Sequence, residues 1–446
     1  QSQLHRFLNC IGGYTKSVDT YSFAAAEVIV PHVLGNFRQH LYEATSWSSI
    51  NKNTELFVAF GGVPVKNGQI SQGGLGEHLQ VSAINKAKKN GIRFINISPL
   101  KNDIPRNIQS KWLKIYPNSD TALMLAICYN LIKNKTYNKE FIKKYTVGFN
   151  RFEDYLTGRQ DGIVKSSDWA SKICNISQRE IDKLSLDMAK NRTMISVSWS
   201  LTRQDHGEQP FWCAIVLSAM LGQIGLPGGG IGFGYSAVNA IGNVKKWLPV
   251  VSFPQIKNPI NSFIPVARIS DMLLNPGGEF HYNGRELTFP DIKIVYWAGG
   301  NPFHHHQDLK RLVRAWKKPE TIISHEWCWN SLSKHSDIIL PCTTTLERRD
   351  ISISPQDEYV ISMEKAIEPI GNSKNDYDIF KGISKILNVE DKFTENKTDF
   401  EWQRWIYEQT SLNFKKDGLK LPNFDDFLKK GWVKINVPEK DLIMME

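Results

Sequence analysis

The sequence predicts an α/β protein built from two doubly wound nucleotide-binding lobes. Short runs rich in apolar and β-branched residues alternate with helical stretches, as in ELFVAFGG (55–62), the helical stretch 77–91 and IRFINISP (92–99). Each such run ends in a glycine-bearing or polar loop, and no repeat at a fixed short period appears. In open parallel sheets, ligands bind at the ends of strands of this kind.

Further strand-then-loop units follow the first pair. TMISVSWS (193–200) precedes a polar loop and a long helix that begins near Pro210. Three more runs read as strands: residues 291–302, 320–327 and 336–341. This rhythm favours doubly wound α/β over an all-α or all-β fold.

Helical segments occupy other parts of the chain. TYSFAAAEVIVPHVLG (20–35) reads as a buried helix ended by Pro31 and Gly35. Beyond Asp391 the chain is polar and lysine-rich, and three tryptophans suggest packed helices there: Trp402, Trp405 and Trp432. The chain begins in a helix-like QLHRFLNC without an initiator methionine, so we expect it to be the central part of a longer protein.

Composition narrows the class of protein. With 446 residues, 41% of them hydrophobic and 22% charged, the chain is globular and large enough for two or more domains. The net charge of +10 comes from lysines scattered between apolar segments, so we expect no nucleic-acid partner. The most apolar window, 211–230, is interrupted by Ser218 and Gln223, which predicts no transmembrane segment. Six cysteines without a CxxC pair indicate neither a zinc ribbon nor an iron–sulfur centre.

Five loops at predicted strand ends combine glycine or proline with groups suited to a nucleotide. Their candidate residues are Lys66; Trp199, Arg203 and His206; Gly228 and Gly229; Gly299, Asn301, His305 and Gln307; and Asp337. Each loop has a plainer interpretation as a tight turn, a solvated lysine or a helix cap, and the three consecutive histidines could form a metal patch. Together they exceed what one mononucleotide needs and would suit two guanine nucleotides.

Five stretches, in order along nearly the whole chain, resemble the dimethyl sulfoxide reductase family of molybdenum enzymes. They are TYSFAAAEVIVPHVLG, WSLTRQDHGEQPFW, MLGQIGLPGGGIG, GGNPFHHHQD and HSDIILPCTTTLERRDIS. The similarity is strongest to the trimethylamine N-oxide and the biotin or methionine sulfoxide reductases. It implies a molybdenum atom held by two molybdopterin guanine dinucleotides.

The resemblance also assigns roles to residues. It makes Ser22, beside Tyr21 at the cofactor, the protein ligand of molybdenum. A deprotonated hydroxyl is a hard donor suited to a high-valent metal, although a simple helix N-cap is the alternative. Lys66 corresponds to a lysine implicated in electron transfer, and Asp120 to an aspartate that pairs with guanine. The remaining loop residues would line the two dinucleotides, with Asp337 at the second guanine.

Some positions depart from the family pattern. Val63 and Ser98 stand where the family often has aspartate, and Asp103 is nearby but shifted, so the ribose contacts there are open. The resemblance implies a Tyr-Gly-Trp type segment that touches substrate upstream of Gln1 and a C-terminal barrel-like domain, and we expect neither within this chain. The resemblance implies one lobe from residues 1–65 plus 318–446 and an inserted second lobe, 66–317.

The implied activity is two-electron transfer of an oxygen atom from an S-oxide or N-oxide to Mo(IV), with release of water. Dimethyl sulfoxide, trimethylamine N-oxide and biotin or methionine sulfoxide are the substrates of the family. The alternative is a truncated, non-catalytic remnant that binds the guanine dinucleotides. A haem- or quinol-linked electron donor and a periplasmic location, or alternatively a cytoplasmic one, complete the expectation.

Overall fold

The computed structural model describes residues 2–69, 77–245, 247–355 and 358–446. The chain forms two compact units, each assembled from segments distant in sequence. Unit 1 consists of Gln1–Tyr21, Leu248–Ile353 and Glu358–Asn436; unit 2 consists of Ser22–Trp247, Ser354–Asp357 and Val437–Glu446.

Unit 2 is built on a five-stranded sheet in which every neighbouring pair is parallel. Its strand order is β4-β3-β2-β5-β6, so the order reverses between β2 and β5. The strands are β2 (Leu56–Phe60), β3 (Arg93–Ile97), β4 (Lys111–Leu113), β5 (Thr193–Val197) and β6 (Gly230–Phe233). This is the doubly wound arrangement predicted from the alternating pattern.

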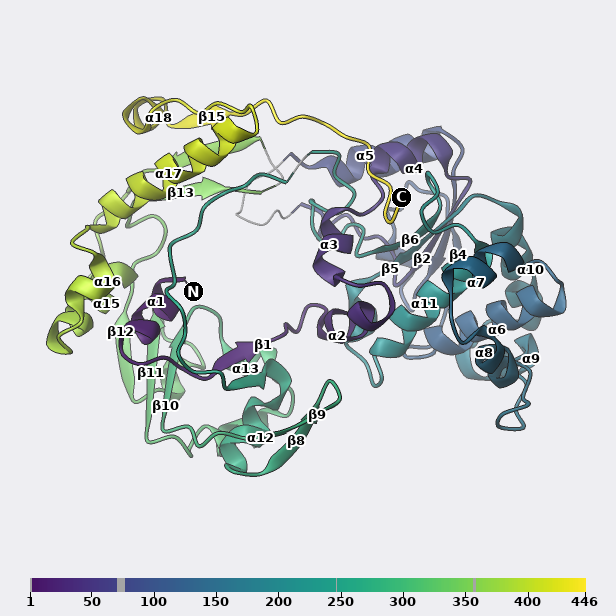
Figure 1. Cartoon of the computed structure of the whole chain (residues 1–446), viewed down its shortest axis with the longest axis horizontal. Helices are drawn as coiled ribbons and strands as arrows, with labels where there is room; N and C mark the ends of the chain where they lie inside the picture. Colours follow the sequence, from purple (N-terminus) through teal and green to yellow (C-terminus); the bar gives the residue numbers. More distant parts are fainter. Residues whose placement is uncertain (1, 70–76, 246, 356–357) are drawn as a thin grey trace. The chain divides into compact units, whose positions relative to one another are not determined.

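Helices cover both faces of this sheet (Figure 1). Every residue of β2 and β5 is buried, as expected for central parallel strands with both faces covered. The long helix α11 packs on β5 and β6, and α6 packs against α11. The helices are α2 (Ala24–Val33), α3 (Phe37–Tyr42), α4 (Trp47–Asn53), α5 (Leu79–Lys89), α6 (Asp120–Lys133), α7 (Lys139–Tyr145), α8 (Phe149–Leu156), α9 (Ser167–Cys174), α10 (Gln178–Lys190) and α11 (Glu208–Leu221), with the short 3-10 turns η1 (Lys101–Asp103) and η2 (Trp199–Thr202).

Unit 1 contains a three-stranded parallel sheet, β10-β11-β12, and an antiparallel sheet, β13-β14-β15. The parallel strands follow one another in sequence order, without the reversal seen in unit 2. Its strands are β1 (Lys16–Val18), β7 (Phe263–Pro265), β8 (Glu279–Tyr282), β9 (Arg285–Thr288), β10 (Ile294–Ala298), β11 (Thr321–Glu326), β12 (Ile338–Pro341), β13 (Asp350–Ile353), β14 (Tyr359–Met363) and β15 (Trp432–Lys434).

The helices of unit 1 lie in the N-terminal, middle and C-terminal segments of the chain. They are α1 (Ser2–Cys10), α12 (Ile269–Leu274), α13 (Pro302–His305), α14 (Leu309–Ala315), α15 (Asp376–Ile386), α16 (Glu390–Thr394), α17 (Asp399–Lys416) and α18 (Phe424–Lys430), with the 3-10 turns η3 (Val266–Arg268) and η4 (Ser333–His335). Helix α1 packs on α15 and α16, so the first helix of the chain completes a core formed largely by the last hundred residues or so.

The units do not coincide with the lobes expected from the resemblance. Residues 22–65 lie in unit 2 because β2 hydrogen-bonds to β3 on one side and to β5 on the other. Residues 248–317 lie in unit 1 because β10 pairs with β11. The strand pairing therefore divides the chain near residues 21 and 247 rather than near 65 and 317.

The six predicted strands and the helices near residues 3–10, 77–91 and 210 are confirmed. Two local predictions are wrong. Helix α2 continues through Pro31 to Val33 and is only partly buried, with Ala26 and Val30 as its buried residues. Trp432 lies in strand β15 and not in a helix, and its side chain is about half exposed.

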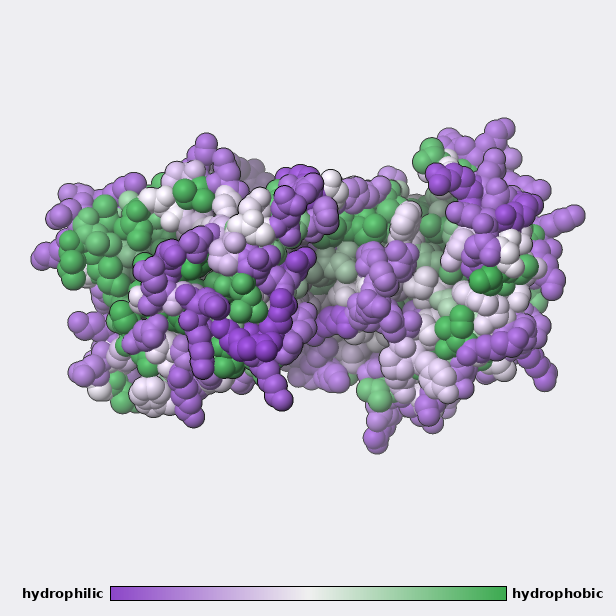
Figure 2. Space-filling view, turned by 90° about the horizontal axis from the view of Figure 1, so that it is seen from below, coloured by the Kyte–Doolittle hydropathy of each residue, from purple (hydrophilic) through white to green (hydrophobic). Residues whose placement is uncertain are grey.

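The surface is polar over much of the face drawn in Figure 2, with hydrophobic patches between the hydrophilic side chains. In the described part of the chain, no helix combines the length and the apolar composition needed to span a bilayer.

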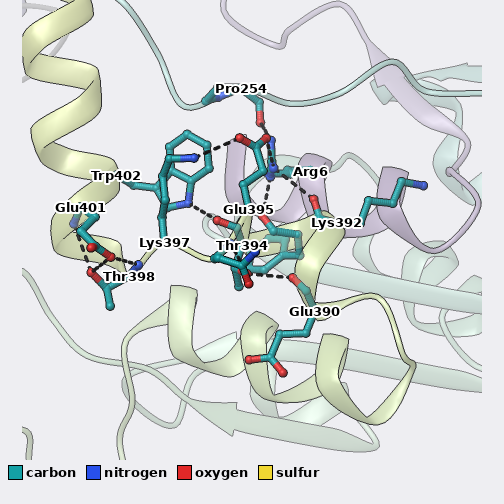
Figure 3. Close-up of polar contacts among 12 residues, drawn as sticks. Arg6, Pro254, Glu390, Lys392, Thr394, Glu395, Lys397, Thr398, Glu401 and Trp402 are labelled. Carbon is teal, nitrogen blue, oxygen red and sulfur yellow. Dashed lines mark hydrogen bonds and ion pairs between the residues drawn. The ribbon is translucent and has the colours of Figure 1, made fainter.

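Arg6 fastens helix α1 to the rest of unit 1 (Figure 3). Its side chain is 1% exposed, and its guanidinium donates to the carbonyls of Phe393, Pro254 and Lys392 at 2.6, 3.1 and 3.1 Å. It also pairs with the Glu395 carboxylate at 2.7 Å. A planar group with five N–H donors is needed to satisfy acceptors from several directions at once, so arginine is the residue that fits this position.

Arg6→Ala is expected to lower the free energy of unfolding of unit 1 by about 3–5 kcal/mol, because three carbonyls lose their charged donor at a buried position. Urea unfolding followed by tryptophan fluorescence measures this change. Arg404→Ala is the matched control, since Arg404 forms an exposed pair with Asp425 at 2.7 Å and should cost at most about 1 kcal/mol. Equal losses in the two variants would contradict the role assigned to Arg6.

Candidate functional site

The carboxyl ends of all five strands of the unit 2 sheet lie at one edge, because every pair is parallel. The reversal of strand order between β2 and β5 makes the loops after these two strands the preferred place for a ligand. Both loops were selected from the sequence, the first for Lys66 and the second for Trp199, Arg203 and His206.

The loop after β2 begins with two glycines in left-handed conformations. Gly61 has φ +82° and Gly62 has φ +79°. A Cβ on Gly61 would lie 2.5 Å from the Leu201 side chain and 2.6 Å from Cβ of Ser198, so the loops after β2 and β5 touch at the switch point. Lys66 follows in the same loop and is exposed.

The loop after β5 forms the turn η2, which Ser198 caps through a hydrogen bond from Ser200 N at 3.3 Å. Trp199 Nε1 is a buried donor with no hydrogen-bond partner among the described residues. Arg203 and His206 are exposed, and His206 adopts φ +51° just before α11 begins. The loop therefore offers two groups to a ligand at the switch point: the indole N–H of Trp199, which has no hydrogen-bond acceptor in the described part of the chain, and the exposed guanidinium of Arg203.

Ser22 lies near the same edge, because its neighbour Phe23 packs on Trp199. The Phe23 ring lies edge-on to the Trp199 ring, with centroids 4.6 Å apart, and also contacts Phe37 at 5.4 Å. Helix α2, which starts at Ala24, packs on α11 and η2. Phe23 is the N-cap residue of α2, so Ser22 precedes the cap and is not itself the N-cap.

The loop after β3 brings Asp103 back to the strand end. The Ser98 hydroxyl donates to the Asp103 carboxylate at 2.5 Å, and Ser98 Oγ accepts from Leu100 N at 3.2 Å. Val63 is fully buried and offers no polar group. The aspartate that is shifted in sequence therefore supplies a carboxylate at the end of β3, which the linear spacing did not reveal.

Asp120 follows β4 and is the first residue of α6. It is 5% exposed, and burial raises the pKa of its carboxyl to about 7, with an opposing effect of its own backbone N–H. One edge of the unit 2 sheet thus carries Asp120 at the start of α6 and, in loops or turns, Ser22, Lys66, Trp199, Arg203 and Asp103.

Gly228 and Gly229 lie at the opposite, amino edge, because they precede β6. Gly228 has φ +66°, its carbonyl accepts from the Thr54 hydroxyl at 2.5 Å, and a Cβ there would meet Asn53 and Thr54. A Cβ on Gly229 would meet Arg192. Close packing explains both glycines, so we leave them out of the site proposed below.

Unit 1 offers a second edge at the carboxyl ends of its parallel strands. Gly299 and Gly300 follow β10 with φ +83° and +76°, and a Cβ on either would meet nothing within 4 Å. Asn301 caps α13 by accepting from Phe303 N at 3.0 Å, and its amide donates to the Ser331 hydroxyl in the loop after β11 at 3.1 Å. The loops after β10 and β11 are therefore joined, beside an open pair of glycines.

Tyr21 belongs to this second edge. Its hydroxyl lies 3.0 Å from His306 Nδ1 and 3.3 Å from Gln307 Oε1. Burial raises the pKa of Tyr21 to about 12, and burial together with His305 lowers the pKa of His306 to about 4. His305, chosen from the sequence, is exposed, whereas His306 was missed. Three identical residues in a row gave no means of telling which one turns inward.

Asp337 lies away from this edge. Its carboxylate accepts from Ile322 N at 2.8 Å and its own N–H donates to the Ile322 carbonyl at 2.9 Å. Ile322 is the second residue of β11, so Asp337 lies at the amino edge of the sheet, a strand length from Asn301. Asp337 does not cap a helix either, because its hydrogen bonds extend the pairing of β11 and β12. We therefore leave Asp337 out of the proposed site.

Two further features of the described residues bear on the site. In residues 2–69, 77–245, 247–355 and 358–446, no group of three or more His, Cys, Asp or Glu side chains is arranged to hold a metal ion. A cavity of about 160 Å³ in unit 1 is lined mainly by β13, β14 and α17, away from the residues chosen above.

Comparisons with known proteins give a consistent result. The family model for molybdopterin oxidoreductase matches residues 1–386. The chain is 41% identical over 429 residues to a biotin sulfoxide reductase of Cereibacter sphaeroides, covering 96% of this chain and 58% of that protein. It is 38% identical over 446 residues to a trimethylamine-N-oxide reductase of Haemophilus influenzae, covering 95% of this chain and 53% of that protein. The chain thus spans a little over half the length of these relatives.

Among solved structures, acetylene hydratase from Pelobacter acetylenicus matches with a TM-score of 0.56 and 15% identity, covering 98% of this chain and 59% of that structure. At this identity the similarity concerns the fold alone.

The buried carboxyl of Asp120 makes stability depend on pH. Because its folded pKa of about 7 exceeds the ordinary value of 3.8, the folded chain binds a proton more readily between these values. The free energy of unfolding should therefore fall as pH rises from 4 to 7. Asp120→Asn should raise it at pH 8 by up to about 4 kcal/mol and leave it unchanged below about pH 4, as measured by urea unfolding of the apoprotein. Asp205→Asn, at an exposed position, is the control; a pH-independent effect of Asp120→Asn would contradict the assignment.

Proposed function

The chain belongs to the dimethyl sulfoxide reductase family of molybdopterin oxidoreductases, and on that premise we propose that it is the cofactor-binding part of a molybdenum-dependent reductase of S-oxides or N-oxides. The family implies a molybdenum–pterin cofactor. We propose its finer form to be two molybdopterin guanine dinucleotides, one for each sheet edge. The names of the relatives support an oxide of sulfur or nitrogen as the substrate.

One observation carries the proposal: the Phe23–Trp199 contact brings Ser22 to the switch point of the unit 2 sheet. A serine at this place is adjacent to loops suited to a nucleotide, and its oxygen is a hard donor for a high-valent metal. We therefore assign Ser22 as the protein ligand of molybdenum. Among the described residues no rival cluster of His, Cys, Asp or Glu competes for that role.

The unit 2 edge has groups for each part of a guanine dinucleotide. Lys66 and Arg203 are exposed cations, neither in an ion pair with a described residue, and suit the phosphates near the switch point. Asp103, held at the end of β3 by Ser98, is in the position where doubly wound folds hold a ribose. Asp120, after β4, offers two carboxylate oxygens to the N1 and N2 donors of guanine.

The unit 1 edge suits the second dinucleotide. Gly299 and Gly300 leave open space beside a backbone turned into left-handed conformations, where N–H groups can face an anion. Asn301 and Gln307 add neutral donors and acceptors at the same edge. The residues at both edges thus fit the group that the family implies.

When bound, the cofactor would supply the two-electron chemistry that removes the oxide oxygen. The overall reaction consumes one oxide, two electrons and two protons, and gives the reduced substrate and one water. The chain itself would hold the metal through the Ser22 oxygen and bind the nucleotides at the two edges, and Lys66 would act in electron transfer near the pterins. We propose a haem- or quinol-linked electron donor and a periplasmic location, as the resemblance implies.

Ser22→Ala tests the metal ligand in the full-length enzyme. The variant should fold, because Ser22 lies outside α2 and the N-cap residue of that helix is Phe23. X-ray absorption of the variant should show one Mo–O distance fewer than the wild-type enzyme. Its kcat/KM for oxide reduction by a reduced viologen dye should fall by at least about tenfold. Ser200→Ala, at an exposed serine of η2, is the matched control. An unchanged molybdenum spectrum with unchanged turnover would reject the assignment.

The proposed contact between Asp120 and guanine is tested by comparing two nucleotides that differ in their base. Wild-type apoprotein should bind GMP more tightly than IMP, which lacks the N2 amine, by roughly tenfold, since a second hydrogen bond to a carboxylate is worth about 1.5–3 kcal/mol less its desolvation. Asp120→Asn should abolish that preference, because an amide offers one acceptor in place of two. Isothermal titration calorimetry of GMP and IMP against both proteins measures the four affinities. If Asp120→Asn still binds GMP more tightly than IMP, guanine does not contact Asp120.

A further inference from the structure

We propose that Tyr21 and His306 form a latch that positions Ser22. The latch is defined as the Tyr21 hydroxyl with its three neighbours: Val266 O, His306 Nδ1 and Gln307 Oε1. The inference rests on the proposed function, because it concerns the residue that follows Tyr21. It makes Tyr21 and His306 positioning residues, acting through the backbone and not on the substrate.

The latch has a well-defined geometry within unit 1. The Tyr21 hydroxyl lies 3.1 Å from the Val266 carbonyl, 3.0 Å from His306 Nδ1 and 3.3 Å from Gln307 Oε1. The Tyr21 and His306 rings also meet edge to face, with centroids 5.4 Å apart. A phenol held by three groups and a ring contact has little freedom to rotate.

The proton arrangement follows from the chemistry of the partners. Val266 O and Gln307 Oε1 accept only, so the single Tyr21 proton goes to one of them. The Tyr21 oxygen then accepts, and the group beside it that can donate is His306, through Nδ1–H. The assigned tautomer carries its proton on Nδ1 and leaves Nε2 as an acceptor.

The contacts of the latch come from two parts of unit 1 that are fixed independently. Val266 directly follows β7, which pairs with β1, the strand three residues before Tyr21. His306 and Gln307 directly follow α13, whose start Asn301 caps. The latch therefore ties the end of the β1 segment to the loop proposed to hold the second dinucleotide.

Ser22 is joined directly to the latch residue Tyr21. Consecutive Cα atoms are about 3.8 Å apart, so anchoring Tyr21 restricts where the Ser22 oxygen can lie relative to the latch. A metal ligand with a restricted set of positions is the arrangement expected of a preorganised site.

The experiment uses the full-length, molybdenum-loaded enzyme with three variants. Tyr21→Phe removes the hydroxyl and keeps the ring contact. His306→Asn places an amide donor near the position of Nδ1, whereas His306→Gln places it near Nε2. Tyr407→Phe is the matched control, since Tyr407 also donates from its hydroxyl to a backbone carbonyl in unit 1, that of Pro422 at 3.0 Å.

Tyr21→Phe and His306→Gln should broaden or split the Mo(V) electron paramagnetic resonance signal, because the serine oxygen then samples more than one position. They should lower kcat by about 10- to 100-fold with a smaller change in KM. His306→Asn and Tyr407→Phe should keep the wild-type signal and kcat.

The outcomes separate this inference from the proposed function. A wild-type signal in Tyr21→Phe, or an equal loss in His306→Asn and His306→Gln, would overturn the latch while leaving Ser22 as ligand. Absence of any Mo(V) signal and of oxide reduction in the wild-type enzyme would instead overturn the proposed function, and the latch with it.

Discussion

The pairing of β2 with both β3 and β5 is the constraint on which the rest of unit 2 depends. Leu56–Phe60 is buried throughout, so it can lie only at the centre of a sheet that is covered on both faces. Because β3 pairs on one side of β2 and β5 on the other, the strand order reverses beside β2, and the loops after β2 and β5 meet. Gly61 therefore lies against the loop that begins at Ser198. Trp199 in the same loop contacts the ring of Phe23.

Much of this could be read from the sequence, because it depends on local pattern. One example is the β-branched run Thr193–Val197, which predicts a buried strand. The polar loop after this run predicts that its carboxyl end faces a binding site. Which edge a loop occupies was harder to predict. Gly228 resembles a phosphate-binding glycine in a short window, yet it precedes its strand, so it lies at the amino edge and packs on Thr54. Asp337 likewise precedes its strand, β12, and lies at the amino edge.

Other features depend on hydrogen bonds between residues far apart, or on which of several equivalent residues turns inward. Asp103 returns to Ser98 because the intervening turn η1 reverses the chain, and spacing alone does not predict that. His306 contacts Tyr21 across 285 residues. The overall fold does not decide the chemistry either: the matching acetylene hydratase is named for a hydration and not for a reduction. The assignment of function therefore rests on the site residues and on relatives of higher sequence identity, 41% and 38%.

The central proposal is that each of the two sheet edges holds one guanine dinucleotide. The most direct test is the ratio of released GMP to molybdenum in the purified full-length protein, with GMP freed by acid hydrolysis and molybdenum measured by mass spectrometry. Two GMP per molybdenum is the predicted result. Molybdenum without GMP, or one GMP per metal atom, would contradict the claim and restrict the nucleotide to at most one edge.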